Sequence, residues 1–388
     1  MNNNFPKLAM AKFSEQFKGQ KLISMHATNP EPFSQAELQQ TIGQSFESIL
    51  KNVNLGFAAD EGTLTLRQTL AKNLYDGVSA ADVITHAGAQ EALFCAFHAL
   101  LQAGDKVLVV APIFEPLVQI PLNIGCEVSY THLDSNNNWS LNLDDVEQQF
   151  SSGCRLFVIN FPHNPTGATI TGVELQNIIN LCRKYDVWLL SDEVFRGLEH
   201  DIKYRLPAVA DIYEKGISVG VISKAYAVPG IRVGWLVCQD KQLRDRVLDI
   251  KGYLSICNSQ IDEKLASEIL KTPEKLLKRN LKIIIKNKRF LENIKSIFGI
   301  GIEIIIPSVG CCVFAVLKGS GTLAPPIKQN NSKTKASLST GSEFLVKHIA
   351  EKTNYLLYPS SLFKTEVEAL RIGFGGKKFN EFVHVLKT

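Results

Sequence analysis

Short apolar runs between turns recur along the first two thirds of the chain, and stretches with helical spacing separate them. The runs predict strands at residues 82–86, 106–111, 155–160, 187–190, 217–222 and 233–238. Amphipathic helices are predicted between them, most clearly at 89–102 and 172–185. Several runs are apolar without alternation, which is typical of strands buried on both faces of a parallel sheet. The pattern therefore indicates an α/β fold with a mainly parallel sheet covered by helices.

The pattern changes after residue 240. Two long helical patterns cover residues 240–270 and 273–296. Short strands predicted at 301–306 and 313–318 introduce a second α+β unit. Residues 1–50 contain helical fragments around an extended piece near 22–32.

A chain of 388 residues is too long for one ordinary core. We predict an N-terminal segment (1–45) that packs with the small domain, a large domain (46–275) and a small C-terminal domain (276–388). The segment between 318 and 342 is rich in Gly, Ser, Thr, Asn and Lys, and we predict an exposed, mobile loop without chemistry there.

Composition narrows the class of protein further. The chain is 45% hydrophobic and 21% charged, with a net charge of +4, which is ordinary for a soluble enzyme. It has no long basic run and no apolar run of membrane-spanning length, so we expect neither a nucleic-acid nor a membrane partner. The first residues lack a hydrophobic signal core, so a cytoplasmic location is expected. The eight cysteines show no ligand spacing, so we expect no metal.

Lys224 follows a predicted strand and precedes Arg232 by eight residues. A lysine at a buried strand end is costly unless it is paired or uncharged, and an imine with an aldehyde cofactor keeps it uncharged. Arg232 would then hold an anionic group of that cofactor, and pyridoxal phosphate (PLP) has both an aldehyde and a phosphate. Taken alone, the two residues are better explained as surface residues that flank a turn, and only the rest of the chain favours a cofactor site.

Other strand ends carry side chains that suit the same cofactor. Gly88-Ala89-Gln90 opens a helix, where free backbone N–H groups bind phosphate. Phe114 follows a strand and could stack on a pyridine ring, although a core position fits it as well. The turn Asn160-Phe161-Pro162-His163-Asn164-Pro165 ends another strand and places Asn164 to donate a hydrogen bond.

Two buried charges complete the pattern. Asp192 ends an apolar strand and could pair with a protonated pyridine nitrogen. A helix cap or a structural salt bridge would also explain it, and Glu193 is an alternative acid. Arg371 lies inside an apolar strand, where its planar guanidinium could take a substrate carboxylate or form an internal salt bridge.

These motifs, in this order, resemble the class I/II aminotransferases, which are fold-type I PLP-dependent enzymes. The likeness covers nearly the whole chain and includes the segment that begins with Phe57. Three motifs look closest to the branch that contains capreomycidine synthase: the Asn160–Pro165 turn, Ser223-Lys224-Ala225-Tyr226 and Leu370-Arg371-Ile372-Gly373-Phe374. The resemblance implies a three-layer α/β/α large domain with a mainly parallel seven-stranded sheet, and a smaller α+β domain.

The resemblance also implies a role for each position. Lys224 would carry the internal aldimine, Asp192 would bind the pyridine nitrogen and Asn164 the ring's 3-oxygen. Phe114 would stack on the ring. The phosphate would lie at Gly88, Ala89, Gln90, Ser223 and Arg232, and the substrate carboxylate at Arg371 with Asn160. Family members are usually homodimers with sites at the interface, so a homodimer is expected.

Three positions depart from the family pattern because each lacks a usual hydroxyl. Phe195, expected beside the cofactor, stands where many relatives have Tyr, and Phe57 stands where many have a Tyr that reaches the phosphate in the partner subunit. Val221 stands where a phosphate-binding Ser is often found, and the hydroxyl of Ser223 could take over that contact. The Phe195 change is predicted to alter the pKa of the lysine–cofactor imine. A pH titration of the cofactor's absorbance tests this.

The favoured function is transfer of the amino group of an L-amino acid to a 2-oxo acid. The alternative keeps PLP but eliminates, cyclises or oxidises the amino acid. His26 and Arg196 are candidate extra groups for it, although a structural polar role explains each of them better. A PLP-binding regulator is disfavoured because only about 50 residues, none of them a basic run, precede the core. Nucleotide enzymes are disfavoured because the sequence contains no G-x-x-x-x-G-K-[ST] motif and no G-x-G-x-x-G motif after a strand.

Overall fold

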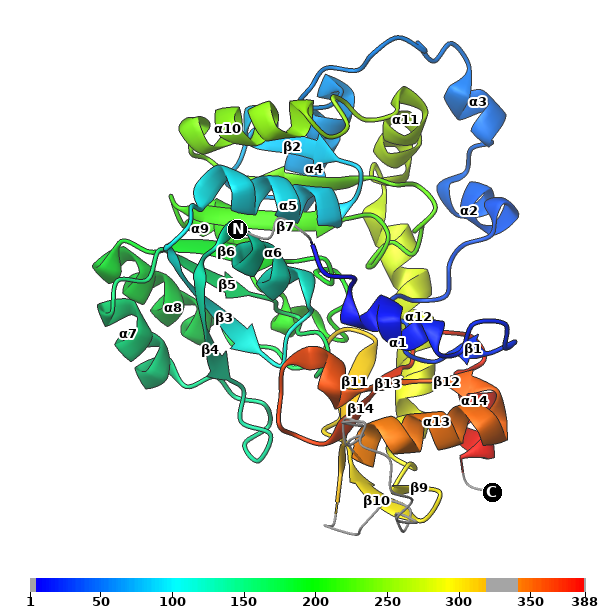
Figure 1. Cartoon of the computed structure of the whole chain (residues 1–388). Helices are drawn as coiled ribbons and strands as arrows, with labels where there is room; N and C mark the ends of the chain where they lie inside the picture. The colour runs from blue at the N-terminus through cyan, green and yellow to red at the C-terminus, as the bar shows by residue number, and fades with distance from the viewer. Residues whose placement is uncertain (1–4, 319–340, 387–388) are drawn as a thin grey trace.

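A seven-stranded sheet forms the centre of the larger part of the molecule (Figure 1). The computed structural model describes residues 5–318 and 341–386. The strand order is β2-β8-β7-β6-β5-β3-β4. The strands are β2 (Val83–His86), β3 (Lys106–Ala111), β4 (Glu127–His132), β5 (Leu156–Ile159), β6 (Trp188–Asp192), β7 (Gly216–Val221) and β8 (Gly234–Val237). Only β8 runs antiparallel to its neighbours, which confirms the mainly parallel sheet.

Alternate residues of the central strands point to opposite faces of the sheet. In β3, Val107 and Val109 pack with α5, α6 and α10, whereas Leu108 and Val110 belong to the core on the other face. The flanking helices are α4 (Leu64–Leu74), α5 (Ala89–Leu100), α6 (Pro116–Ile124), α7 (Leu143–Ser151), α8 (Gly172–Tyr185), α9 (Val209–Ile212), α10 (Lys241–Gly252) and α11 (Gln260–Ile269). Both faces are therefore covered, and the three-layer prediction is confirmed.

Two details differ from the predicted elements. The helical pattern at 240–270 is two helices, α10 and α11, because residues 253–259 leave the helix and Ile256 adopts a positive φ of 64°. The edge strand β4 was not among the predicted runs. Its residues are partly exposed and polar, so they lack the continuous apolar signal of the central strands.

A five-stranded sheet, ordered β13-β14-β11-β10-β9, forms the second unit. Its strands are β9 (Ser296–Ile297), β10 (Ile300–Glu303), β11 (Cys312–Leu317), β13 (Tyr358–Pro359) and β14 (Ala369–Gly373). Helices α12 (Pro273–Leu291), α13 (Gly341–Thr353) and α14 (Phe379–Val385) accompany it, and short 3₁₀ helices lie at Ala80–Asp82, Ile202–Tyr204 and Ser360–Phe363. The predicted boundaries at 45/46 and 275/276 stay predictions.

The N-terminal segment runs beside the second unit (Figure 1). It contains α1 (Ala9–Glu15), β1 (Ile23–Ser24) and α2 (Gln35–Ile42), and it is followed by α3 (Phe46–Leu50), which packs against α11. Strand β1 pairs with β12 (Tyr355–Leu356) in parallel. The Met25 carbonyl accepts a hydrogen bond from the Gly373 amide at 2.6 Å. These backbone bonds fix the segment against the strand that carries Arg371.

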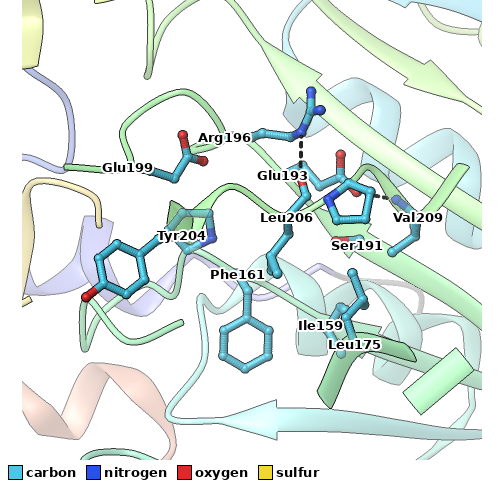
Figure 2. Close-up of a pocket in the computed structure, with 12 residues that line it drawn as sticks. Ile159, Phe161, Leu175, Ser191, Glu193, Arg196, Glu199, Tyr204, Leu206 and Val209 are labelled. Carbon is cyan, nitrogen blue, oxygen red and sulfur yellow. Dashed lines mark hydrogen bonds between the residues drawn. The ribbon is translucent and has the colours of Figure 1, made fainter. Parts of the chain in front are cut away.

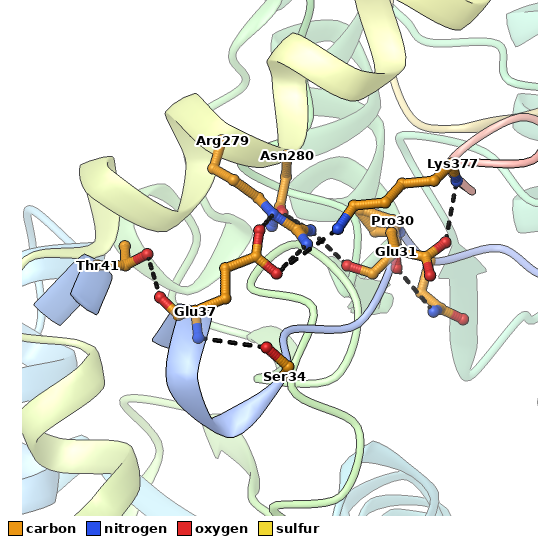
Figure 3. Close-up of polar contacts among 9 residues, drawn as sticks. Pro30, Glu31, Ser34, Glu37, Thr41, Arg279, Asn280 and Lys377 are labelled. Atoms are coloured by element: carbon orange, nitrogen blue, oxygen red, sulfur yellow. Dashed lines mark hydrogen bonds and ion pairs between the residues drawn. The ribbon is translucent and has the colours of Figure 1, made fainter. Parts of the chain in front are cut away.

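Helix α12 holds the same segment through side chains (Figure 3). Arg279 donates to both carboxylate oxygens of Glu37, at 3.0 and 2.9 Å, and to the Glu31 carbonyl. The next residue, Asn280, donates to the Ala225 carbonyl at 2.8 Å, immediately after Lys224. A bidentate guanidinium–carboxylate pair fixes geometry as well as adding energy. Helix α12 therefore connects the N-terminal segment to the loop that carries Lys224.

Three other sequence expectations concern what the described residues contain. No helix among them is long and apolar enough to cross a membrane. Within the same residues, no group of three or more His, Cys, Asp or Glu side chains is arranged to hold a metal ion. All eight cysteines are free, and seven of them are buried. The predicted mobile loop falls almost entirely on residues 319–340, outside the described ranges.

Candidate active site

A cavity of about 490 Å³ lies where the carboxyl ends of the parallel strands meet the second unit. Ligands of open α/β sheets bind at this edge because the loops after neighbouring parallel strands converge there. The structure brings nearly all the predicted site residues to its wall: Ala89, Gln90, Phe114, Asn164, Asp192, Phe195, Ser223, Lys224, Arg232 and Arg371. Val221 also lines the cavity, whereas Phe57 is 86% exposed and does not.

Lys224 extends into this cavity from the loop after β7. Its Nζ donates a hydrogen bond to the Thr28 hydroxyl at 2.8 Å, and it lies 5.8 Å from the centre of the Phe195 ring. Burial, with the positive charge of Arg371, lowers the pKa of the Lys224 ammonium. A lowered pKa increases the neutral amine, which is the form that attacks an aldehyde or accepts a proton.

The start of α5 offers groups that could hold an anion. The helix begins at Ala89, and no side chain caps its first N–H groups. Arg232 packs directly against Gly88, because a Cβ built on this glycine would lie 2.5 Å from Arg232 Nη2. A helix N-terminus and a guanidinium together favour a doubly charged group such as a phosphate.

Gly88→Ala is therefore expected to weaken PLP binding. The new methyl group would displace Arg232, and the positive φ of 92° at Gly88 disfavours any side chain. Gly104→Ala is the matched control, since Gly104 has a φ of 88° but nothing within 4 Å of its Cβ position. Fluorescence titration of the cofactor-free proteins with PLP measures the effect. If both variants lost PLP affinity equally, backbone strain would explain the loss and displacement of Arg232 would not.

Asp192 and Glu193 are adjacent in sequence but face different cavities. Asp192, at the end of β6, lines the cavity of Lys224, and burial raises its pKa to about 6. Glu193 lines a second, smaller cavity, where its Oε1 accepts a hydrogen bond from the Val209 amide at 2.9 Å (Figure 2). The same oxygen accepts a hydrogen bond from the Ser218 hydroxyl at 2.8 Å. Asp192 is thus the only one of the two that faces Lys224, and a cationic ring nitrogen would stabilise its ionised form.

Arg196 does not line the main cavity, so the structure favours the structural alternative over an extra catalytic group. It lies beside Glu193 in the second cavity (Figure 2). Its guanidinium donates to the carbonyls of Leu206 (3.2 Å) and Leu74 (2.6 Å). These bonds connect surrounding loops, which is a structural role.

Arg371 is a buried cation whose guanidinium is only partly hydrogen-bonded. It is 4% exposed, and its Nη1 donates to Asn164 Oδ1 at 3.0 Å while its buried Nε has no partner. Its guanidinium lies 5.1 Å from the Tyr358 ring centre and 5.0 Å from that of Phe363. Burial lowers its pKa to about 10, and no carboxylate of the described residues pairs with it. The internal salt bridge left open by the sequence is not formed, so a bound carboxylate is the natural partner.

Asn160 differs from its predicted place at the substrate carboxylate. Its side-chain nitrogen donates to the Asp192 carbonyl at 2.7 Å, and its oxygen accepts from the Asn164 amide at 2.9 Å. It is buried and is not part of the cavity wall. Both ends of its amide are thus used to position Asn164 and Asp192, so Asn160 has no free group for a carboxylate.

Sequence reasoning missed several cavity residues, of which Thr28 and Tyr358 make the contacts that matter most here. Thr28, which contacts Lys224, and Tyr358 in β13 were not singled out. His26 was named only as a candidate extra group. It stacks flat on Tyr358, with ring centres 3.7 Å apart. An extended N-terminal segment has no local signal of its destination. Contacts with residues far along the chain, such as the pairing of β1 with β12, bring it to the cavity.

The residues present fit PLP. The cavity combines a lysine with a lowered pKa, an uncapped helix start beside Arg232, a buried carboxyl group and the flat ring of Phe114. These groups match the aldehyde, phosphate, ring nitrogen and ring face of the cofactor. The sheet, the second unit and this cavity define the class as a PLP-dependent enzyme of fold type I.

The chain belongs to the family of class I and II aminotransferases, whose family model matches residues 38–383. PLP is the cofactor that this family and these residues imply. Two curated relatives illustrate the range of chemistry. An aspartate aminotransferase of Sulfurisphaera tokodaii is 25% identical and covers 98% of this chain and 94% of its own. The capreomycidine synthase of Streptomyces vinaceus is 28% identical and covers 81% of this chain and 75% of its own.

Solved structures agree on the fold. A PLP-dependent aminotransferase from Streptococcus suis has a TM-score of 0.84 at 23% identity and covers 98% of this chain and 97% of its own. The PLP-dependent cyclase OrfR has a TM-score of 0.83 at 20% identity, and the match covers 99% of this chain and 97% of the cyclase chain. Similar backbones therefore carry different reactions, and the reaction has to be argued from the site.

Proposed function

We propose that the protein is an aminotransferase that moves the amino group of an L-amino acid to a 2-oxo acid. The observation that carries the proposal is the cavity shared by Lys224 and Arg371. A lysine of lowered pKa and a buried guanidinium without a carboxylate partner face the same space. An amino acid offers an amine and a carboxylate on one carbon atom, and it matches this pair.

The roles of the residues follow from their contacts. Bound PLP supplies an aldehyde and an electron-withdrawing ring that stabilises negative charge at the substrate α-carbon. Arg371 binds the substrate carboxylate, with its orientation set by Asn164. Lys224 Nζ acts as the base that removes the α-proton and later returns a proton. The ionised Asp192 carboxylate keeps a proton on the ring nitrogen, and Arg232 with the start of α5 holds the phosphate.

A specific observation favours the alternative of elimination, cyclisation or oxidation. Phe195 and Val221 line the cavity where many relatives have hydroxyl groups, and a different hydroxyl, that of Thr28, contacts Lys224 instead. The likeness to capreomycidine synthase is consistent with this alternative. The hydroxyl groups around Lys224 affect where protons are delivered, so their rearrangement bears on transamination more than on PLP binding.

A product analysis separates the two functions. The PLP-loaded protein is incubated with each of the twenty L-amino acids, with and without a 2-oxo acid, and amino acids and ammonia are quantified. Transamination predicts a new amino acid only when the 2-oxo acid is present, with no net ammonia. Release of ammonia, or a cyclic product, without any 2-oxo acid would support the alternative and overturn transamination.

We also propose that the protein works as a homodimer. Several large apolar side chains are exposed: Leu55 (77%), Phe57 (86%) and Tyr253 (92%). Such side chains are often buried at interfaces between subunits. Light scattering of the purified protein gives the mass in solution, and a monomer at micromolar concentration would contradict the proposal.

A further inference from the structure

We infer that Thr28 is a positioning residue: its hydroxyl holds Lys224 Nζ, once this amine has been released from the cofactor, for proton transfer at the substrate α-carbon. The inference rests on the proposed aminotransfer and adds a residue to it. It starts from the hydrogen bond of 2.8 Å that Lys224 Nζ donates to the Thr28 hydroxyl. Any groups that a second subunit brings to the cavity would act in addition to this contact.

The backbone on both sides of Thr28 is fixed against β14 and the residues that follow this strand. On one side, the Met25 carbonyl accepts a hydrogen bond from the Gly373 amide at 2.6 Å. On the other side, the Glu31 amide donates to the Gly375 carbonyl at 2.9 Å. Thr28 lies midway between these two bonds, so the chain that carries its side chain has little freedom to move.

The side chain of Thr28 is constrained as well. A Cβ built on Gly373 would overlap the Ala27 carbonyl oxygen, so the segment lies directly against the glycine backbone. Thr28 is 5% exposed, and its β-branched side chain has few alternatives at χ1. The hydroxyl is therefore held at one place in the cavity wall.

Lys224 needs such a fixed partner more than its own loop does. The loop is tied to the N-terminal segment because the Phe33 amide donates to the Ala227 carbonyl at 3.1 Å. The lysine side chain, in contrast, has a flexible four-carbon stem, and ordering it costs up to about 2 kcal/mol of rotamer entropy. A hydrogen bond to the Thr28 hydroxyl limits where the released amine can go.

The contact suits the proton that Lys224 has to move. A neutral amine has two N–H groups and one lone pair. When one N–H donates to the Thr28 oxygen, the lone pair remains free to take the α-proton, and the C–H electron pair moves into the ring of the bound cofactor. The amine becomes an ammonium, whose charge strengthens the hydrogen bond to the same oxygen. Thr28 therefore stabilises the product of proton removal more than the starting amine, which favours the step.

A neutral hydroxyl also leaves the amine available as a base. Burial and the charge of Arg371 lower the pKa of Lys224, while Cys311, Cys312 and Asp192 act in the opposite direction to a smaller extent. A carboxylate as the direct partner would favour the ammonium strongly, whereas a hydroxyl orients the amine without adding a full charge. The residue type at position 28 thus fits a base that has to be neutral before it acts.

The cofactor-free protein tests the contact without any turnover. Acetic anhydride labels neutral amines, so the pH dependence of acetylation at Lys224, followed by mass spectrometry, gives the pKa of this amine. The Thr28 oxygen favours the ammonium, so Thr28→Val should lower this pKa by about one unit. Thr28→Ser keeps the hydroxyl and should give the wild-type pKa. An unchanged or raised pKa in Thr28→Val would show that the hydroxyl does not hold the amine.

Single-turnover kinetics of the PLP-loaded protein test the role in proton transfer, with the amino acid found to react in the product analysis. Thr28→Val should lower the rate at saturating substrate at least about ten-fold, with substrate and PLP affinities within about two-fold of wild type. The α-deuterated amino acid should show a primary isotope effect in this variant, and Thr28→Ser should recover most of the rate. Wild-type speed in Thr28→Val, or a slow reaction without an isotope effect, would overturn the inference.

Thr41→Val is the control for loss of a threonine hydroxyl in the same segment. The Thr41 hydroxyl donates to the Glu37 backbone carbonyl at 2.7 Å, away from the cavity (Figure 3). This variant should change neither the pKa of Lys224 nor the rate. If it matched Thr28→Val in both, a disturbed N-terminal segment would explain the results and the contact with Lys224 would not. If no amino acid reacts with the wild-type protein, the proposed function fails, and acetylation still decides whether the contact exists.

Discussion

Lys224→Ala should abolish turnover without destabilising the protein. Loss of a nucleophile that is also the catalytic base is expected to reduce kcat/KM by at least about 10⁴-fold. The visible absorbance of the lysine-bound cofactor should disappear as well. The free energy of unfolding should not fall, because the wild-type protein holds this amine in surroundings that lower its pKa. Steady-state kinetics, absorbance spectra and thermal melts of the cofactor-free proteins measure the three effects.

Lys241→Ala is the control for this variant. Lys241 is a 77% exposed lysine that pairs with Asp245 on the surface of α10. Its removal should change neither the spectrum nor the rate. Wild-type turnover in Lys224→Ala would show that another group carries the reaction, and the whole assignment of the site would have to be abandoned.

Asp192→Asn is expected to have the second largest effect. The ring nitrogen would lose its counter-charge in a buried site, which costs on the order of 3–5 kcal/mol. This cost would lower the rate and the affinity for PLP roughly a hundred- to several-thousand-fold. Glu193→Gln is a closely matched control, because the neighbouring carboxyl group faces the second cavity. Loss of PLP binding in Glu193→Gln and not in Asp192→Asn would reverse the two roles.

The same substitution should stabilise the cofactor-free protein in a pH-dependent way. Asp192 has a pKa of about 6 in the fold against an ordinary 3.8. The folded chain therefore binds more protons than the unfolded chain between these values, and stability declines as the pH rises through the window. Above it, the buried carboxylate costs roughly 3 kcal/mol. Asp192→Asn cannot ionise, so denaturant unfolding should show it more stable than wild type at pH 8 and about equal at pH 4.

The central sheet could be predicted from sequence because its strands are buried on both faces. The run at 106–111 coincides with β3, and the helical pattern at 172–185 coincides with α8. Where burial is one-sided the signal weakens, as for the partly exposed edge strand β4. The break between α10 and α11 was also hidden, because residues 253–259 contain apolar side chains that continue the helical pattern while remaining exposed at Tyr253 and Ile256.

Within the site, residues at strand ends were predictable and residues that act through distant contacts were not. Lys224 and Asp192 follow buried strands, so their position is fixed by the strand itself. Arg371 could have formed an internal salt bridge or remained available for a substrate carboxylate. Only the three-dimensional structure distinguishes the two, because a sequence does not show that no carboxylate of the described residues pairs with it. Asn160 was misplaced because a carboxamide can bind substrate or backbone equally well, and here the backbone uses both of its ends.

The contacts of the N-terminal segment determine how far the chain can be shortened from its N-terminus. Proteolysis at residue 30 would spare every strand of the seven-stranded sheet. It would nevertheless remove His26 and Thr28 from the cavity, together with the β1 pairing that brings them there. The minimal catalytic unit is thus larger than the sheet-bearing region, and a shortened protein could keep its secondary structure while losing the hydroxyl that holds Lys224.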